Sequence, residues 1–120
     1  MDRWLCYWVP LFAYCVLIFL LSSISNPFPS LAGFGNDKLL HIAEYSVLGF
    51  LMARAMFSLN LWHSKRVVVV LIVTLSALYG LSDEVHQSFT LGRSANVGDI
   101  VADGFGSLIG AFCYLKILLK

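Results

Sequence analysis

The sequence predicts an all-α integral membrane protein, a four-helix bundle that forms a single transmembrane domain over residues 1–120. Hydrophobic residues make up 59% of the chain and Asp, Glu, Lys and Arg only 12%, whereas soluble domains carry about 45–50% apolar and about 25% charged residues. The mean hydropathy of +0.82 agrees with a membrane protein. The apolar residues also fall into separate runs of roughly 20 residues, the length of helix that crosses a hydrocarbon core.

Segments rich in turn-forming residues separate these runs. The first run is uncharged and contains Pro10, which should kink the helix or lie near its first turns. It is longer than the apolar core of a signal peptide, and the SSISN that follows has no A-x-A site, so we expect it to remain as a span. Asp37 can cap the second helix. The expected spans cover residues 4–22, 38–58, 67–87 and 97–118.

The basic residues beside the spans predict the orientation, because cytoplasmic ends carry an excess of Lys and Arg. One side of the membrane would hold Arg3, Lys65, Arg66, Lys116 and Lys120, and the other would hold Lys38 and Arg93. We therefore expect a multi-pass protein of the cell membrane with both termini in the cytoplasm.

Polar side chains gather at the outer end of this predicted bundle. Residues three or four apart are neighbours on a helix. One helix face therefore carries His41, Glu44 and Tyr45, and a face of the next helix carries Asp83 and Gln87. The candidate pocket residues are Asp37, Lys38, His41, Glu44, Tyr45, Asp83, Glu84, His86, Gln87, Arg93, Asp99 and Asp103. Nucleic acid is not an expected partner, since the net charge is only +1 and no basic stripe is present.

These polar residues have three interpretations. Charges near span ends can be solvated, and buried ones can form a structural hydrogen-bond network between helices. Glu44 and Asp103 favour a polar pocket, because each lies inside a span, where an unpaired charge costs about 2–3 kcal/mol toward the centre. We expect Asp83 and Gln87 to point toward His41 and Asp99.

Two finer expectations concern the neighbours of this pocket. Arg93 should fold back and pair with Asp83 or Asp99. Glu84 lies about 100° around the helix from Asp83 and is expected at the rim.

Along the last span, Gly106 and Gly110 form a G-x-x-x-G pattern that predicts close helix packing within the bundle rather than dimerisation.

The segments DKLLHIAEYSVLGFL and YGLSDEVHQSFTLGRSANVGDIVADGFGSLIG resemble the VanZ-like family. The matching pattern runs D-K-x-x-H-x-x-x-Y-x-x-L-G, then D-E-x-x-Q, then G-R-x-x-x-x-x-D. Asp103 departs from it, since many members carry Asn there. The resemblance implies a small multi-pass membrane protein of the cell envelope. The family's namesake is linked to resistance to the antibiotic teicoplanin, so the resemblance also implies a role in antibiotic resistance and glycopeptide susceptibility.

Two functions remain open at this point. A binding or modulating protein would receive the headgroup of a membrane lipid or of a lipid-linked cell-wall precursor, with Lys38 and Arg93 toward its phosphate. An enzyme at the outer leaflet would act on a lipid-linked phosphate or ester, with His41 or a carboxylate as acid or base. With two imidazoles and several carboxylates, a divalent metal stays open for the enzyme. No metal-binding motif or nucleophile stands out, so we predict no particular residue as a metal ligand. The cofactor, the oligomeric state and catalysis itself stay undetermined.

Overall fold

The computed structural model describes residues 2–25, 30, 34–60 and 63–120. They form four helices, α1 (Arg3–Ser22), α2 (Phe34–Phe57), α3 (Lys65–Ser88) and α4 (Val97–Leu118), and contain no strand. All four helices are long and apolar enough to cross a bilayer, which confirms the predicted membrane four-helix bundle. The predicted ends agree within about two residues except at α2, which begins four residues before the expected residue 38.

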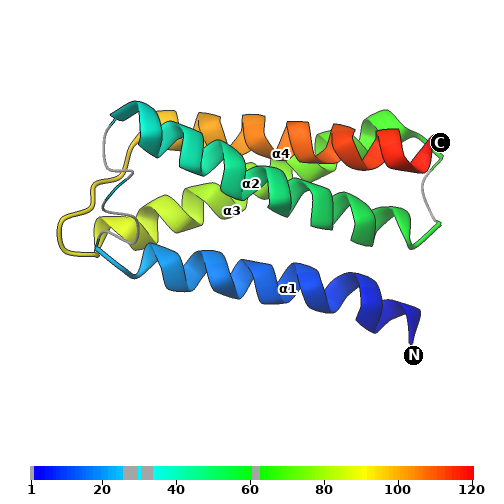
Figure 1. Cartoon of the computed structure of the whole chain (residues 1–120), viewed down its shortest axis with the longest axis horizontal. Helices are drawn as coiled ribbons and strands as arrows, with labels where there is room; N and C mark the ends of the chain where they lie inside the picture. The colour runs from blue at the N-terminus through cyan, green and yellow to red at the C-terminus, as the bar shows by residue number, and fades with distance from the viewer. Residues whose placement is uncertain (1, 26–29, 31–33, 61–62) are drawn as a thin grey trace.

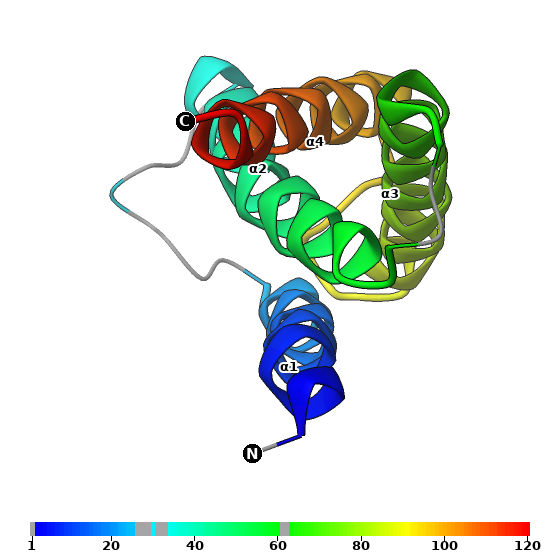
Figure 2. The same ribbon diagram turned by 90° about the vertical axis from the view of Figure 1, so that its right-hand side faces the viewer.

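The helices run alongside one another, and both termini lie at the same end of the bundle (Figure 1). The opposite end carries the connection between α3 and α4. Viewed end-on, α2, α3 and α4 form a closed group, while α1 lies against one side of it (Figure 2). We refer to the two ends of the bundle as the terminal end and the polar end.

Small residues bring α2 and α4 into close contact. A Cβ added to Gly106 would overlap the backbone of Ile42, and one added to Gly110 would overlap the backbone of Ser46. On α2, Gly49 has the same relationship to the backbone of Ser107. Since lipid tails are as apolar as the helices, such close approach is a main source of packing energy in a membrane. The expected role of Gly106 and Gly110 inside the bundle is confirmed.

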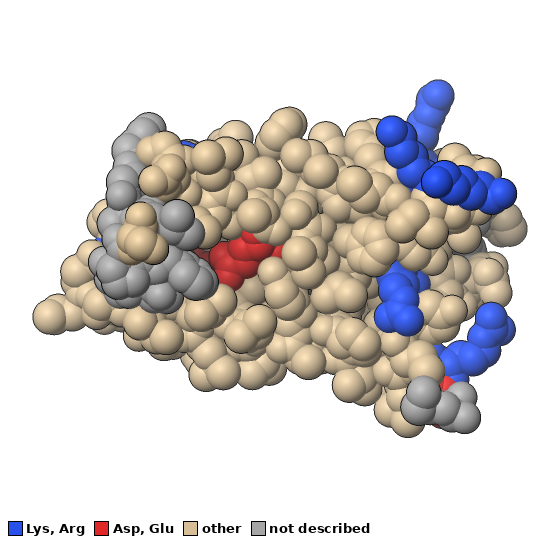
Figure 3. Space-filling view, in the orientation of Figure 1, with Lys and Arg blue, Asp and Glu red and all other residues tan. Residues whose placement is uncertain are grey.

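Large apolar residues cover much of the outside, as a hydrocarbon surrounding requires. Lys and Arg cluster at the terminal end (Figure 3). One of them, Arg54, lies over the ring of Tyr7 at 4.6 Å and donates a 2.9 Å hydrogen bond to the Cys6 carbonyl. α1 and α2 are thereby joined at this end.

Candidate functional site

The polar end holds a set of buried polar side chains that come from three helices. We call it the polar cluster; each member is at most 4% exposed. α2 supplies one residue near its start, α3 three near its end, and α4 two near its start. The members are His41, Asp83, Glu84, Gln87, Asp99 and Asp103. Sequence analysis had placed all six in the candidate pocket, so the structure brings these residues together as expected.

His41 lies at the centre of the cluster, between two carboxylates of α4. Its Nδ1 is 2.8 Å from Oδ1 of Asp103, and its Nε2 is 3.7 Å from Oδ2 of Asp99. Asp99 and Asp103 are one helical turn apart and therefore face α2 together. The pairing holds the imidazole in a fixed orientation.

Asp99 has a second partner in Lys38, with which it forms an ion pair. Lys38 lies one turn before His41 on α2, so the same helix face delivers both groups to Asp99. The Lys38 side chain is 21% exposed. The cluster thus reaches the molecular surface through Lys38.

Arg93 does not form the expected pair with Asp83 or Asp99. It folds back, but its Nη1 donates to the carbonyl of Ile24 at 3.0 Å and to that of Leu21 at 3.4 Å. No carboxylate among the described residues lies within ion-pair distance of it, although its charge and that of His41 both act on Asp83. The physical reason is that backbone carbonyls at the C-terminal end of a helix lack helical partners. The carbonyls at the end of α1 and just after it lie nearer to Arg93 than these two carboxylates do.

α1 contributes a contact that sequence analysis missed. The Ser22 hydroxyl donates to Asp83, and the Gln87 amide donates to Asp83 at 3.0 Å and to Ser22 at 3.3 Å. Ser22 is itself buried. A serine at the end of an apolar span looks like an ordinary cap, and only its position opposite SDEVHQ could have suggested this role.

His86 takes part in the attachment of α1 and not in the cluster. Its Nε2 lies 2.9 Å from the Ser23 hydroxyl, and its ring stacks on Phe19 with a centroid distance of 4.3 Å. The side chain is half-buried. Of the two candidate imidazoles, only His41 is therefore surrounded by carboxylates.

Glu84 is not at the rim, as expected, but is only 2% exposed. Its Oε2 accepts the backbone N–H of Asn96 at 2.9 Å, just before α4 begins. Glu84 does lie about 100° around α3 from Asp83, but α4 packs over the face of α3 that carries Glu84 and buries it. Oε1 of Glu84 and Oδ2 of Asp103 are buried without a hydrogen-bond partner among the described residues.

The remaining candidates surround the cluster. Tyr45 is fully buried in an apolar core, and its hydroxyl also lacks a partner within the described part of the chain. Asp37 and Glu44 are half-buried. A small patch of acidic atoms is visible on one face of the molecule, toward the polar end (Figure 3).

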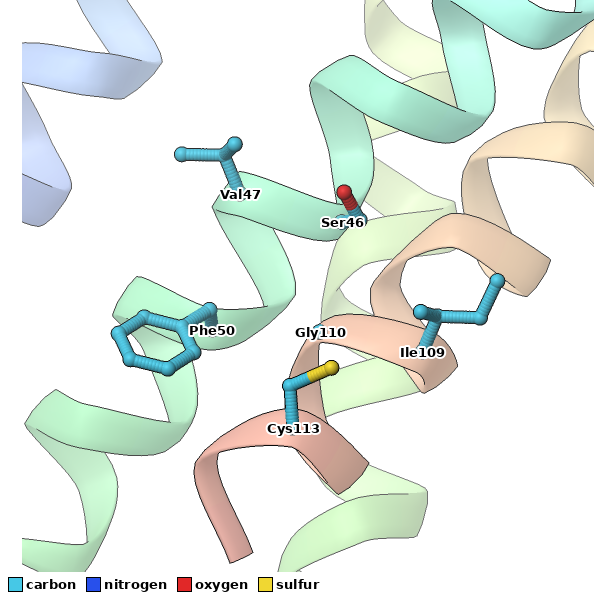
Figure 4. Close-up of a pocket in the computed structure, with 6 residues that line it drawn as sticks. All are labelled: Ser46, Val47, Phe50, Ile109, Gly110 and Cys113. Carbon is cyan, nitrogen blue, oxygen red and sulfur yellow. The ribbon is translucent and has the colours of Figure 1, made fainter. Parts of the chain in front are cut away.

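An apolar groove of about 250 Å³ lies elsewhere, between α2 and α4 (Figure 4). It is lined by Ser46, Val47, Phe50, Ile109, Gly110 and Cys113. Gly110 lines the groove and also contacts the α2 backbone. None of the polar cluster lines this groove, so the two features are separate.

Chemically, the polar cluster is rich in hydrogen-bond acceptors. Among the described residues, two groups of three could hold a metal ion, because the ligand atoms of each group lie within 4.8 Å of one another. The first group is Asp37, His41 and Asp99, and the second is His41, Glu84 and Asp103. Beyond a metal, carboxylates can accept hydrogen bonds from hydroxyl and ammonium groups. The site is thus suited to a cation or to a ligand with many donors.

Comparison with protein families finds one match, to the model of the VanZ/LLP1 family, over residues 7–119. Comparisons with curated proteins and with solved structures give no significant match. The family match spans all four helices, and it confirms the resemblance carried by the DKLLH and SDEVHQ segments.

Proposed function

The chain belongs to the VanZ/LLP1 family, and we propose that it binds the polar headgroup of a membrane lipid or of a lipid-linked cell-envelope precursor at the polar cluster. The observation that carries this proposal is the convergence of buried ionisable side chains from three membrane-spanning helices. Ionisable groups in such helices are costly and usually mark a binding site or a pathway. A family match to a membrane protein is compatible with a lipid ligand.

The chemistry of the cluster favours a headgroup with hydroxyl or amino groups. Carboxylates outnumber basic groups here, and a carboxylate accepts but does not donate hydrogen bonds when ionised. Lys38 and Arg93 lie at the edge, where a phosphate linked to the headgroup would reach them. A sugar or amino headgroup carried on a phosphate meets both requirements.

We propose that the polar end faces outward and that both termini are cytoplasmic in the cell membrane. The support is the collection of Lys and Arg at the terminal end (Figure 3), because cytoplasmic ends carry the excess of these residues. A headgroup in the outer leaflet would then lie at the depth of the cluster. Binding of a cell-wall precursor there would alter its availability to glycopeptides, which is the role in susceptibility that the family resemblance suggests.

Native mass spectrometry of the full chain from mild detergent tests the headgroup proposal. Wild-type protein should retain a defined lipid, and Asp83→Asn or His41→Ala should lose it. Asp2→Asn makes the same chemical change as Asp83→Asn at an exposed position of the terminal end and should retain the lipid, as should Lys120→Ala. Equal lipid retention by wild type and Asp83→Asn would rule out the cluster as the binding site.

A second candidate is hydrolysis of a lipid-linked phosphate or ester. The observation in its favour is His41, held 2.8 Å from Asp103 as a general base is held by a carboxylate. Turnover of the retained lipid by wild type, lost in His41→Gln, would support an enzyme. Retention of unchanged lipid over the same time would support binding alone.

A further inference from the structure

We infer that His41, Glu84 and Asp103 form a binding site for a divalent transition-metal ion. The residues come from α2, α3 and α4, and one ligand atom of each lies within 4.8 Å of the other two. Each side chain is at least nine-tenths buried. Imidazole and carboxylate groups that converge in this way are typical metal ligands.

An independent observation points to a ligand at this place. Oε1 of Glu84 and Oδ2 of Asp103 are buried and have no hydrogen-bond partner among the described residues. Buried carboxylate oxygens are normally paired or coordinated, because the uncompensated group loses its hydration. Two such atoms on two of the three proposed ligands are accounted for if an ion lies between them.

The local geometry also suits an ion. Two ligand atoms at about 2.0–2.2 Å from one zinc ion lie roughly 3–3.5 Å apart. Nδ1 of His41 and Oδ1 of Asp103 are 2.8 Å apart, a hydrogen-bond distance, so an ion would replace the proton between them and move the two atoms apart by a few tenths of an ångström. The other ring nitrogen is 3.7 Å from Asp99, which places that carboxylate to orient the imidazole, as is usual behind a metal-bound histidine. On α3, Gly80 leaves the space that the Asp103 carboxylate occupies, since a Cβ there would crowd it.

Charge favours a dication in particular. Among the described residues, neither Glu84 nor Asp103 has an ion pair with Lys or Arg, whereas the charge of Asp99 is already met by Lys38. Asp103 lies against His41, but two buried carboxylates beside one imidazole leave negative charge inside membrane-spanning helices, which is costly. One divalent ion offsets both.

The ligand set selects the kind of ion. Imidazole suits zinc, copper, iron and nickel, while carboxylates suit magnesium, calcium and manganese. A mixed set of one imidazole and two carboxylates favours Zn²⁺ or Mn²⁺ over Mg²⁺ and Ca²⁺. The alternative group of Asp37, His41 and Asp99 is the weaker site, because Asp37 is half-buried and Asp99 is engaged by Lys38.

Isothermal titration of chelator-stripped, detergent-solubilised full-length protein with Zn²⁺ and with Mn²⁺ tests the inference. We expect about one ion per chain, with weaker or no binding of Mg²⁺. Glu84→Gln and His41→Gln should each weaken binding by about 100-fold or more, and Asp99→Asn by about 10- to 100-fold. Asp37→Asn separates this site from the alternative group and should bind as wild type does, and Asp2→Asn, at an exposed position of the terminal end, is the control.

Only variants that fold are compared, as judged by helical circular dichroism and size-exclusion profile. If Glu84→Gln does not fold, His41→Gln takes its place as the ligand variant. Absence of Zn²⁺ and Mn²⁺ binding by the stripped wild type would overturn the inference, as would wild-type affinity in both ligand variants. Loss in Asp37→Asn with retention in Glu84→Gln would also overturn it. The titration contains no headgroup, so its result is independent of lipid retention.

Discussion

Gly110 on α4 lies directly against the backbone of Ser46 on α2, so closely that a Cβ at position 110 would overlap the Ser46 carbonyl oxygen. Four residues earlier, Gly106 meets Ile42 in the same way. The two contacts repeat with the helical period, and they fix the distance between the helices that carry His41, Asp99 and Asp103. The position of the polar cluster therefore depends on residues that are not polar.

Gly110→Ala should destabilise the protein by about 1–3 kcal/mol, the usual range for overpacking. The added methyl group meets backbone atoms, which cannot rotate away as a side chain can. Gly104→Ala on the same helix is the control, because a Cβ there meets nothing within 4 Å, and alanine is the better helix former by about 0.5–1 kcal/mol. Thermal unfolding in detergent measures both. A stable Gly110→Ala protein would mean that α2 and α4 are farther apart.

Ser22→Ala should destabilise the packing of α1 against α3. The change removes a donor from the buried Asp83 carboxylate, and a hydrogen bond to a charged group contributes about 1.5–3 kcal/mol. Ser82→Ala on α3 is the control, since its hydroxyl is exposed and donates to the Tyr79 carbonyl of its own helix. Proteolysis of α1 in detergent should be faster in Ser22→Ala than in Ser82→Ala. Equal rates would indicate that Ser22 does not hold the helix.

Lys38→Met should destabilise the protein more than the double variant Lys38→Met/Asp99→Asn. Removal of the lysine alone leaves Asp99 buried without its ion-pair partner, which costs more than removal of both charges. A double-mutant cycle from thermal or denaturant unfolding should give a coupling energy of about 0.5–3 kcal/mol. Additive effects would mean that the pair is broken in solution.

A reporter that works only in the cytoplasm should be active when it is fused after Lys120. A reporter that works only outside the cytoplasm should be active when it is inserted after Ser94. Both expectations follow from the Lys and Arg residues at the terminal end. The two fusions control for each other, because α4 separates them. Activity of the Lys120 fusion outside would place the polar cluster at the inner leaflet, and its headgroup would have to be sought there.

Hydropathy and helical period together predict much of this molecule. Runs of roughly 20 apolar residues locate all four spans, and the up-and-down order of the spans brings the polar ends of α2, α3 and α4 together. That order alone was enough to place His41 near Asp99 and Asp103. The G-x-x-x-G pattern likewise predicts the closeness of α4 to a neighbour, although not that the neighbour is α2.

The errors concern rotation and the path of loops. A helix that is apolar on most faces gives no periodic signal for which face is covered, so Glu84 was expected at a rim that α4 in fact encloses. Arg93 follows a loop, and its partners depend on where the end of α1 lies. Gly49 and Gly80 belong to no G-x-x-x-G pattern, and their close contacts become visible only when the opposing backbone or side chain is present.

The pairing of His41 with Asp103 also has a consequence for biogenesis. α2 has the lowest hydropathy of the four spans, at 1.2, and its histidine finds its partner 62 residues later in the chain. At a synthesis rate of about 5–20 residues per second, roughly 3–12 s separate the two residues on the ribosome. During that interval α2 and α3 carry polar groups into the membrane before α4 can neutralise them. We therefore expect α2 and α3 to need shelter from lipid until the last span arrives, and a chain truncated before α4 to be degraded.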